Sequence, residues 1–284
     1  MTHYILTLSC PDARGIVARV TGFLAEYDGF IIESTQFGDP STRQFFMRVH
    51  FAAGEKTPAS ENFIQAFTHA VAEPFSMHWK LTDASVRPRV LILVSKQLHC
   101  LNDLLHRQRS GQLAMEIPAV ISNHDDARSM VEWHGIAYHH LPVTTETKAA
   151  QERAILDIVA RENIDMVVLA RYMQILSPEL STSLQGRAIN IHHSFLPSFK
   201  GAKPYHQAHA RGVKIIGATA HYVTDALDEG PIIEQEVTRV DHSHSPESLT
   251  AVGQDIEALV LSRALKYQIE QRVLLNGNKT VVFK

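Results

Sequence analysis

The stretch VLILVS, residues 90–95, is followed closely by LHCLNDLLHRQRSG, residues 98–111. An uninterrupted aliphatic run is typical of a strand that is buried on both faces, as in parallel sheets covered by helices. In the second segment the apolar residues recur every three or four positions, which indicates a helix. The two segments together predict a strand and a covering helix, the first repeat of a parallel α/β sheet.

The same alternation continues along the chain. Strands at 117–122, 137–143, 165–170 and 188–191 alternate with helical patterns at 127–135 and 146–163. Residues 214–223 and 231–240 are expected as antiparallel additions, and residues 245–274 as one long helix with Gly253 as a candidate break. We therefore expect a Rossmann-like, mostly parallel, doubly wound sheet.

The N-terminal third has a different pattern. Strand-like segments at 4–9, 30–37, 43–51 and 76–82 and helical segments at 16–29 and 61–71 follow the order β-α-β-β-α-β. That order is typical of a ferredoxin-like module. The polar segment DASVRPR, residues 83–89, then interrupts the apolar pattern. We expect one domain at residues 1–83, a linker at 84–89 and a second domain at 90–284.

Composition narrows the class of protein. The 284 residues are 45% hydrophobic and 20% charged, with a formal net charge of −3. This balance offers no basic footprint for nucleic acid or for an anionic membrane. The cysteines Cys10 and Cys100 are far apart and outside any C-x-x-C spacing, and no run is long and apolar enough to span a membrane. We expect a cytoplasmic protein without nucleic-acid or membrane partners.

Polar residues gather where two predicted strands end. In INIHHSFLPSFKGAKPYH, residues 189–206, Asn190 and His192 emerge from a short strand, and Asp228 lies in a turn between two later strands. An amide N–H can stabilise an oxyanion, an imidazole can exchange a proton, and a carboxylate can orient either a histidine or a water. Each residue alone has a simpler explanation as a cap, a solvated histidine or a turn residue.

Two long motifs carry a family resemblance. The segments NIHHSFLPSFKGAKPYHQA (190–208) and GATAHYVTDALDEGPII (217–233) resemble the catalytic region of the formyltransferases that use 10-formyltetrahydrofolate. The double histidine of NIHHS, the GAKPYHQA segment and VISNHDDARSMVEWHGI (120–136) are similar to the formyltetrahydrofolate deformylases. Residues 4–82, with PDARGIVARVTGFLAE, are similar to an ACT domain, so the resemblance covers nearly the whole chain.

The resemblance implies a set of residue roles. Asn190 and His192 would polarise the formyl group and stabilise the tetrahedral intermediate, and Asp228 would position the attacking water. The pterin pocket would be lined by the loop RYMQIL, through Met173, Gln174 and Leu176, and Gly230 would form a tight turn that lets backbone reach the folate. The implied reaction is hydrolysis of 10-formyltetrahydrofolate to formate and tetrahydrofolate, which supplies formate to purine and one-carbon metabolism and requires no cofactor.

One segment departs from the related enzymes that formylate glycinamide ribonucleotide. Those relatives carry a glycine-rich loop after the first strand, where backbone amides bind the substrate phosphate. Here the same place reads VSKQLHCLNDLL, residues 94–105, without a glycine. Lys96 can supply charge but not a backbone cradle. We therefore expect water as the acceptor, with side chains of SKQLHC (95–100) blocking the channel for larger acceptors.

The ACT resemblance also implies a regulatory site. In such domains small effectors bind near the first strand-to-helix turn, here residues 12–15 with Asp12 and Gly15. Methionine and glycine are the candidate effectors that the resemblance suggests, and a dimerisation module without a ligand is the alternative. In either case pairing through exposed sheet edges predicts a homo-oligomer.

Other functions stay open at this point. Formyl transfer to an amine is the second enzymatic hypothesis, and a folate- or amino-acid-sensing protein without turnover is the third, although Asn190, His192 and Asp228 together argue against a sensor. The 17 histidines include no H-E-x-x-H, and DHSHS at 241–245 reads as a solvated loop, so we expect no metal. His193 and His206 are predicted either to contact substrate or to make structural hydrogen bonds.

Overall fold

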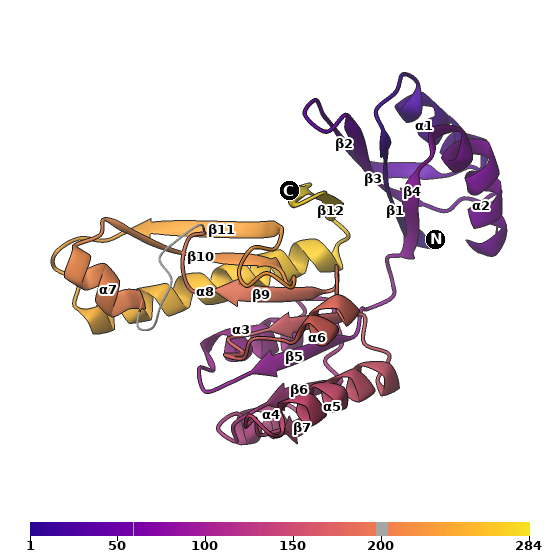
Figure 1. Cartoon of the computed structure of the whole chain (residues 1–284). Helices are drawn as coiled ribbons and strands as arrows, with labels where there is room; N and C mark the ends of the chain where they lie inside the picture. The colour runs from indigo at the N-terminus through magenta and orange to yellow at the C-terminus, as the bar shows by residue number, and fades with distance from the viewer. Residues whose placement is uncertain (59, 197–203) are drawn as a thin grey trace. The chain divides into compact units, whose positions relative to one another are not determined.

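A computed structural model describes residues 1–58, 60–196 and 204–284. Figure 1 shows the course of the chain, which divides into two compact units. Unit 1 comprises Met1–Arg87 and Glu270–Lys284, and unit 2 comprises Pro88–Ile269. The junction falls inside the expected linker at residues 84–89. The last fifteen or so residues differ from expectation, because they pack with the N-terminal unit rather than with the second domain.

Unit 1 contains an antiparallel sheet with the strand order β2-β3-β1-β4. Its strands are β1 (His3–Pro11), β2 (Phe30–Asp39), β3 (Gln44–Ala52) and β4 (His78–Asp83). Its helices are α1 (Ile16–Glu26) and α2 (Ser60–Phe67), the latter extended by a π-helical turn (Thr68–Ala72) and a 3-10 turn (Glu73–Phe75). The ferredoxin-like, ACT-type arrangement expected from the sequence is confirmed.

The core of unit 1 lies between this sheet and its helices. Leu6 and Leu8 alternate along β1 toward Val20 and Leu24 of α1, and all of them are buried. Aromatic rings fill the space between the helices; for example, Phe23 meets Phe67 edge to face at 5.2 Å. Each such side chain contributes about 1.5–3 kcal/mol by leaving water. The alternation along β1 therefore decides which face of the sheet α1 and α2 cover.

The C-terminal segment corrects one sequence-based expectation. The long helix ends at Ile269 instead of continuing to residue 274, and Gln271 has a left-handed φ of 54°. The chain then forms a hairpin of β12 (Val273–Asn276) and β13 (Lys279–Val282) with Gly277 at φ 63° in the turn. The two-residue loop between the strands is Gly277–Asn278, and a Gly-Asn pair between two strand-like segments is a hairpin signal that here overrides the helical spacing.

Side chains attach this hairpin to unit 1. Arg272 pairs with Glu33 of β2 at 3.0 Å, and Asn276 donates to Asp39 at 2.7 Å. Arg48 of β3, which is buried, pairs with the same Glu33 at 2.7 Å and also donates to the carbonyl of Glu270. These charge-assisted contacts explain why residues 270–284 belong to the N-terminal unit.

Unit 2 contains a mixed sheet with the strand order β11-β10-β9-β8-β5-β6-β7. The parallel strands are β5 (Val90–Val94), β6 (Ala119–Ser122), β7 (Ala137–His140), β8 (Met166–Leu169) and β9 (Ala188–His192). Two antiparallel strands extend it, β10 (Ile215–Tyr222) and β11 (Ile232–Arg239). The Rossmann-like sheet and its antiparallel additions are therefore confirmed.

Helices cover this sheet. They are α3 (His99–Arg109), α4 (Arg128–Trp133), α5 (Lys148–Arg161), α6 (Pro178–Ser183), α7 (Pro204–Arg211) and α8 (Pro246–Ile269). In Figure 1, α8 runs along β9, β10 and β11, and it also packs on α3. It continues through Gly253 without a break. Among the helices of the described residues, none is long and apolar enough to cross a membrane.

The strand order places a ligand crevice. From β5 the chain builds β6 and β7 on one side, then returns to add β8 and β9 on the other. Because β5, β8 and β9 are parallel, their carboxyl ends meet at one edge of the sheet. Ligands of open α/β sheets bind beyond that edge, at the point where the strand order reverses.

Candidate active site

A cavity of about 240 Å³ lies at this edge of the sheet. Its lining comes from segments that are far apart in the sequence: Leu169 with residues 171–176, residues 190–193, His221 and residues 223–228. The exposed surface of the wall is largely apolar, and the lining also includes Asn190, His192 and Asp228. Such a pocket suits a ligand that has a flat apolar body and one reacting polar group.

The three residues predicted to act on a formyl group meet in this cavity. Asn190 and His192 lie on β9, and Asp228 lies in the loop that follows β10. The Nδ1 atom of His192 is 3.3 Å from Oδ2 of Asp228. A carboxylate accepts but does not donate, so the shared proton lies on Nδ1 and leaves Nε2 as the acceptor nitrogen of the ring. The pair has the base-and-orienter geometry of a catalytic dyad.

The second nitrogen of His192 has an unusual environment. Its Nε2 atom is buried and has no hydrogen-bond partner among the described residues. An unsatisfied buried polar atom costs about 1–3 kcal/mol, so proteins rarely retain one without a use for it. A substrate group arriving in the cavity would supply the missing partner.

Asp228 is held in an ionised, constrained state. The contacts with His192 and then His221 keep the pKa of its carboxyl well below its usual value. Its backbone has a φ of 59°, a left-handed conformation that costs an ordinary L-residue about 1–2 kcal/mol. Strain of this kind persists where the surroundings fix the residue, and it is common at functional sites.

His221 of β10 orders the amide of Asn190, and the sequence analysis missed it. Its Nδ1 atom donates to the carbonyl of Tyr222 at 2.9 Å. Its Nε2 atom lies 3.2 Å from Nδ2 of Asn190 and 3.6 Å from Oδ1 of Asp228, so His221 contacts both residues. The Asn190 amide carries two N–H groups, and at least one of them remains available to a ligand. A histidine inside the otherwise apolar strand GATAHYV was the signal for this role.

The predicted folate loop forms one wall of the cavity. Met173, Gln174 and Leu176 all line it, and Met173 is 58% exposed. Ser95, at the end of β5, holds this loop: its Oγ accepts from the Met173 N–H at 3.0 Å, and its own N–H donates to the Arg171 carbonyl at 3.2 Å. The position of the loop is therefore fixed by the neighbouring strand.

Gly230 lies beside the site but outside the cavity lining. It is buried, and a Cβ atom at this position would overlap the carbonyl oxygen of Tyr222. The close approach of these two backbones, rather than a positive φ, requires glycine here. Because Tyr222 follows His221, Gly230 sets how tightly the Asp228 loop closes over β10.

The double histidine has two different environments. His193 lines the cavity, and its ring stacks on that of His192, with centroids 4.6 Å apart and 25° between the planes. Arg171 Nη1 donates to His193 Nδ1 at 2.9 Å. Burial, then Arg171 and His192, lower the pKa of His193 to about 4, so its ring is neutral at pH 7. His206 is exposed on α7.

Comparisons with known proteins agree over the whole length of the chain. The family model described as formyl transferase matches residues 88–265. A formyltetrahydrofolate deformylase from Corynebacterium sp. (strain P-1) is 50% identical over 282 residues, which are 99% of this chain and 98% of that protein. A crystal structure of formyltetrahydrofolate deformylase from Burkholderia mallei is 53% identical and covers 100% of both chains with a TM-score of 0.95.

The chain belongs to the formyltetrahydrofolate deformylase family. The similarity to formyltransferases covers a smaller part of the chain. Glycinamide ribonucleotide transformylase 1 from Symbiobacterium toebii is 27% identical and covers 70% of this chain and 95% of its own, with a TM-score of 0.66. Members of the deformylase family thus match both units, whereas the transformylase leaves about a third of this chain unmatched.

In this deformylase-family chain the segment after β5 contains no glycine, as the sequence analysis noted. Lys96 is exposed, Gln97 accepts from Arg171 Nε at 2.8 Å, and His99 begins α3. The loop is therefore attached to Arg171 and α8 by side chains instead of presenting a row of bare backbone amides. This arrangement differs from a phosphate cradle.

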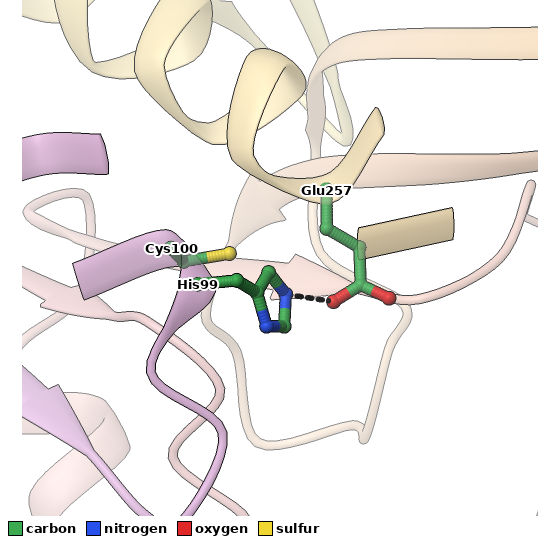
Figure 2. Close-up of side chains that lie close together, drawn as sticks. All are labelled: His99, Cys100 and Glu257. Atoms are coloured by element: carbon green, nitrogen blue, oxygen red, sulfur yellow. Dashed lines mark hydrogen bonds and ion pairs between the residues drawn. The ribbon is translucent and has the colours of Figure 1, made fainter. Parts of the chain in front are cut away.

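A second polar cluster lies under the cavity, and Figure 2 shows three of its members. His99 and Cys100 on α3 face Glu257 on α8, with their potential ligand atoms within 4.8 Å of one another. The Glu257 carboxylate accepts from His99 Nε2 and from Tyr205 at 2.7 Å each, and Arg171 Nε lies 3.3 Å away. These donors, one of them a cation, already satisfy the carboxylate.

The charges of this cluster also disfavour a metal ion. Burial, and then Glu257, raise the pKa of the Cys100 thiol well above its ordinary value, so the sulfur stays protonated. Burial alone would raise the pKa of Glu257, but its contacts with His99, Arg171 and Tyr205 outweigh that effect and lower it. A protonated thiol beside a guanidinium is a poor site for a divalent cation, because metal ligation requires the thiolate.

The predicted effector residues lie in unit 1, in the turn from β1 to α1. Asp12 and Gly15 are both exposed, and Gly15 has a φ of 91° immediately before α1 begins. The Asp12 side chain faces Gly38 of β2, where a Cβ would come within 3.0 Å of its Oδ2. The exposed turn leads directly into α1, whose first N–H groups have no partner within the helix.

Arg171 and Glu257 were also missed by the sequence analysis. Arg171 reads as a loop residue after β8, yet it is 7% exposed and has a φ of 64°. Glu257 lies among the apolar residues on the buried face of α8 and is 1% exposed. A carboxylate at an apolar helix position was a visible signal, but only the fold reveals its partners.

Proposed function

We propose that this protein hydrolyses 10-formyltetrahydrofolate to formate and tetrahydrofolate, with Asn190, His192 and Asp228 as the catalytic residues. The observation that carries the proposal is the meeting of these three side chains in one cavity, in a chain of the deformylase family. The family defines the reaction, and the geometry supplies the residues for it.

The chemistry follows from the atoms available. The free N–H of Asn190 donates to the formyl oxygen as the carbonyl becomes tetrahedral, which is the stage at which charge develops. His192 accepts the proton of the attacking water on Nε2, and ionised Asp228 stabilises the resulting imidazolium through Nδ1. The C–N bond to the folate then breaks, and the proton passes from His192 to the departing nitrogen.

The apolar wall provides the binding energy for the pterin. Met173, Gln174 and Leu176 would contact the ring, with the peptide groups of this loop as hydrogen-bond partners for its polar edge. The 240 Å³ cavity would take the pterin end of the substrate, which carries the reacting formyl group. Water as acceptor is consistent with the segment after β5, which lacks a glycine-rich cradle.

The experiment is formate release without an amine acceptor. Purified wild type and Asp228→Asn are incubated with 10-formyltetrahydrofolate, and formate and tetrahydrofolate are followed together. We expect stoichiometric release by wild type and a loss of at least about 100-fold in the variant. Release that requires an added amine would support the formyltransferase hypothesis, and tight folate binding without any release would support a sensor.

We further propose that unit 1 controls this activity by binding a small amino acid, methionine or glycine, at the turn that contains Asp12 and Gly15. The exposed helix start can bind the carboxylate of the effector, and the Asp12 carboxylate can bind its ammonium group. Equilibrium dialysis with labelled methionine and glycine, on wild type and Asp12→Ala, tests the site. Equal binding by both proteins would exclude this turn.

We also propose a homo-oligomer assembled through unit 1. Edge strand β2 exposes Phe30, Ile32 and Phe37, at 72%, 46% and 46% of their surfaces. Exposed apolar side chains along a sheet edge favour pairing with the edge strand of another chain. Light scattering with Phe30→Ser tests this: the expected result is a lower mass than that of wild type.

A further inference from the structure

The buried cluster around Glu257 connects to the active site through Arg171. Glu257 comes from α8, His99 from α3 and Tyr205 from α7, so one carboxylate receives donors from three elements. Figure 2 shows the His99 ring directed at the Glu257 carboxylate. Tyr205 reaches it because Gly253, one helical turn before Glu257, leaves room for the phenol ring.

Arg171 forms the link from this anchor to the catalytic pair. Its Nε lies 3.3 Å from Glu257 Oε2 and donates to Gln97 at 2.8 Å, while Nη1 donates to His193 Nδ1 at 2.9 Å. The His193 ring in turn stacks on His192. Contacts thus run without a gap from Glu257 through Arg171 and His193 to the ring that faces Asp228.

We propose that Glu257 and Arg171 are positioning residues that hold His193 in one tautomer, stacked against His192, and so fix the ring of His192 for the hydrolysis. This inference rests on the proposed function. The guanidinium donates to His193 Nδ1, which requires a lone pair there and a neutral ring. Glu257 balances the charge of Arg171, so the donor adds little net positive charge beside a histidine that must accept a proton.

Among the described residues, the charged groups and histidines that act on His193 are Arg171, His192, Glu257 and Asp228, and Tyr205 Oη lies 3.5 Å from the His193 carbonyl oxygen. Arg171 opposes protonation of His193, and a protonated His193 would in turn oppose proton uptake by the stacked ring. Loss of Arg171 and loss of the Glu257 charge should therefore shift the protonation of the two histidines in opposite directions. Loss of Arg171 eases protonation of the histidine pair, whereas loss of the Glu257 charge opposes it.

The test compares Arg171→Met and Glu257→Gln in the full chain, with formate release measured across pH. We expect kcat to fall on the order of 10- to 100-fold in both, with KM nearly unchanged, because a misplaced catalytic group affects the chemical step. The acid limb of the kcat profile should move to higher pH in Arg171→Met and to lower pH in Glu257→Gln, each by about one unit.

Arg89→Met is the matched control. Arg89 pairs with Glu116 at 2.9 Å and donates to the Glu162 carbonyl at 2.6 Å, next to the amino end of β5 and outside the cavity lining. Its kcat and its pH profile should match those of wild type. A purely structural role for the Glu257 pair would lower the folded fraction of the variants without moving the acid limb in opposite directions.

Two outcomes would overturn the inference: folded variants with wild-type kcat, or acid limbs that move in the same direction. If the buried variants do not fold, Gln97→Ala is the variant that tests the positioning role. It removes only the exposed partner of Arg171 and leaves the buried pair of Arg171 and Glu257 intact. A fall in kcat of a few-fold at constant KM supports positioning, and an unchanged profile rejects it. Wild type without any formate release would instead reject the proposed function itself.

Discussion

The imidazole rings of His192 and His193 are stacked, with their centroids 4.6 Å apart, and each ring has a different charged partner. His192 faces the carboxylate of Asp228, whereas His193 accepts from the guanidinium of Arg171. Neighbours in the sequence are thus given opposite electrostatic surroundings. The guanidinium opposes protonation of His193, whereas the Asp228 carboxylate faces Nδ1 of His192.

This contrast predicts a pH-dependent stability. The pKa of His193 is lowered from 6.5 to about 4 in the folded chain, so the unfolded chain binds the proton first as the pH falls. The stability that neutral His193 contributes is therefore present above about pH 6.5 and is lost as the pH approaches 4. Between pH 7 and pH 5, wild type should lose about 2 kcal/mol more than His193→Gln. Urea unfolding at both pH values measures this, and parallel losses in the two proteins would contradict it.

Asn190→Ala should lower kcat by roughly 100-fold or more, because the oxyanion would lose a donor that His221 holds in place. Its effect on KM should be small. Formate release and the urea midpoint are measured on the same preparation, so that a folding defect is recognised. A loss below tenfold with unchanged stability would remove Asn190 from the oxyanion site.

Removal of metal should leave the activity intact. Glu257 is already satisfied by protein donors, and Cys100 is held as the thiol. Dialysis against a chelator should therefore change kcat by less than about twofold. The contrary result would be an activity that is lost on chelation and restored by zinc, with His99→Asn abolishing the restoration.

Gly230→Ala should destabilise unit 2 by about 1–3 kcal/mol, because a Cβ would overlap the Tyr222 carbonyl and force two backbone segments apart. Gly135→Ala is the matched control. Gly135 has a φ of 72° but open space around it, so only the conformational cost of about 1–2 kcal/mol applies. The two differ most in activity: Gly230→Ala should displace the Asp228 loop and lower kcat, and Gly135→Ala should not. Equal kcat values would show that the loop tolerates the methyl group.

Arg272→Ala should loosen the C-terminal hairpin. Its partner Glu33 is a third exposed, so the lost pair is worth only about 1 kcal/mol. The sharper readout is limited proteolysis, which should cut residues 270–284 faster than in wild type. Lys80→Ala, at an exposed position of β4, serves as the control. Cleavage at the same rate in all three proteins would show that other contacts hold the hairpin.

The sequence by itself determined the elements whose signals are local. The aliphatic run at residues 90–95 identified β5 as a strand buried on both faces, and the β-α-β-β-α-β order identified the N-terminal module. Asn190 and His192 were visible because they follow one short strand. Periodicity and turn chemistry act over a few residues, so they can be read without knowing the fold.

Only the tertiary structure decided which distant groups meet. It ended α8 at Ile269 and attached the hairpin to β2, although the helical spacing continues further. It also joined Arg171, His193 and Glu257, which come from different elements. The stabilisation of such a network depends on burial and on the exact partners of each charge, because water screens the same charges in the unfolded chain. Strand order and helix packing set those partners, and no local pattern encodes them.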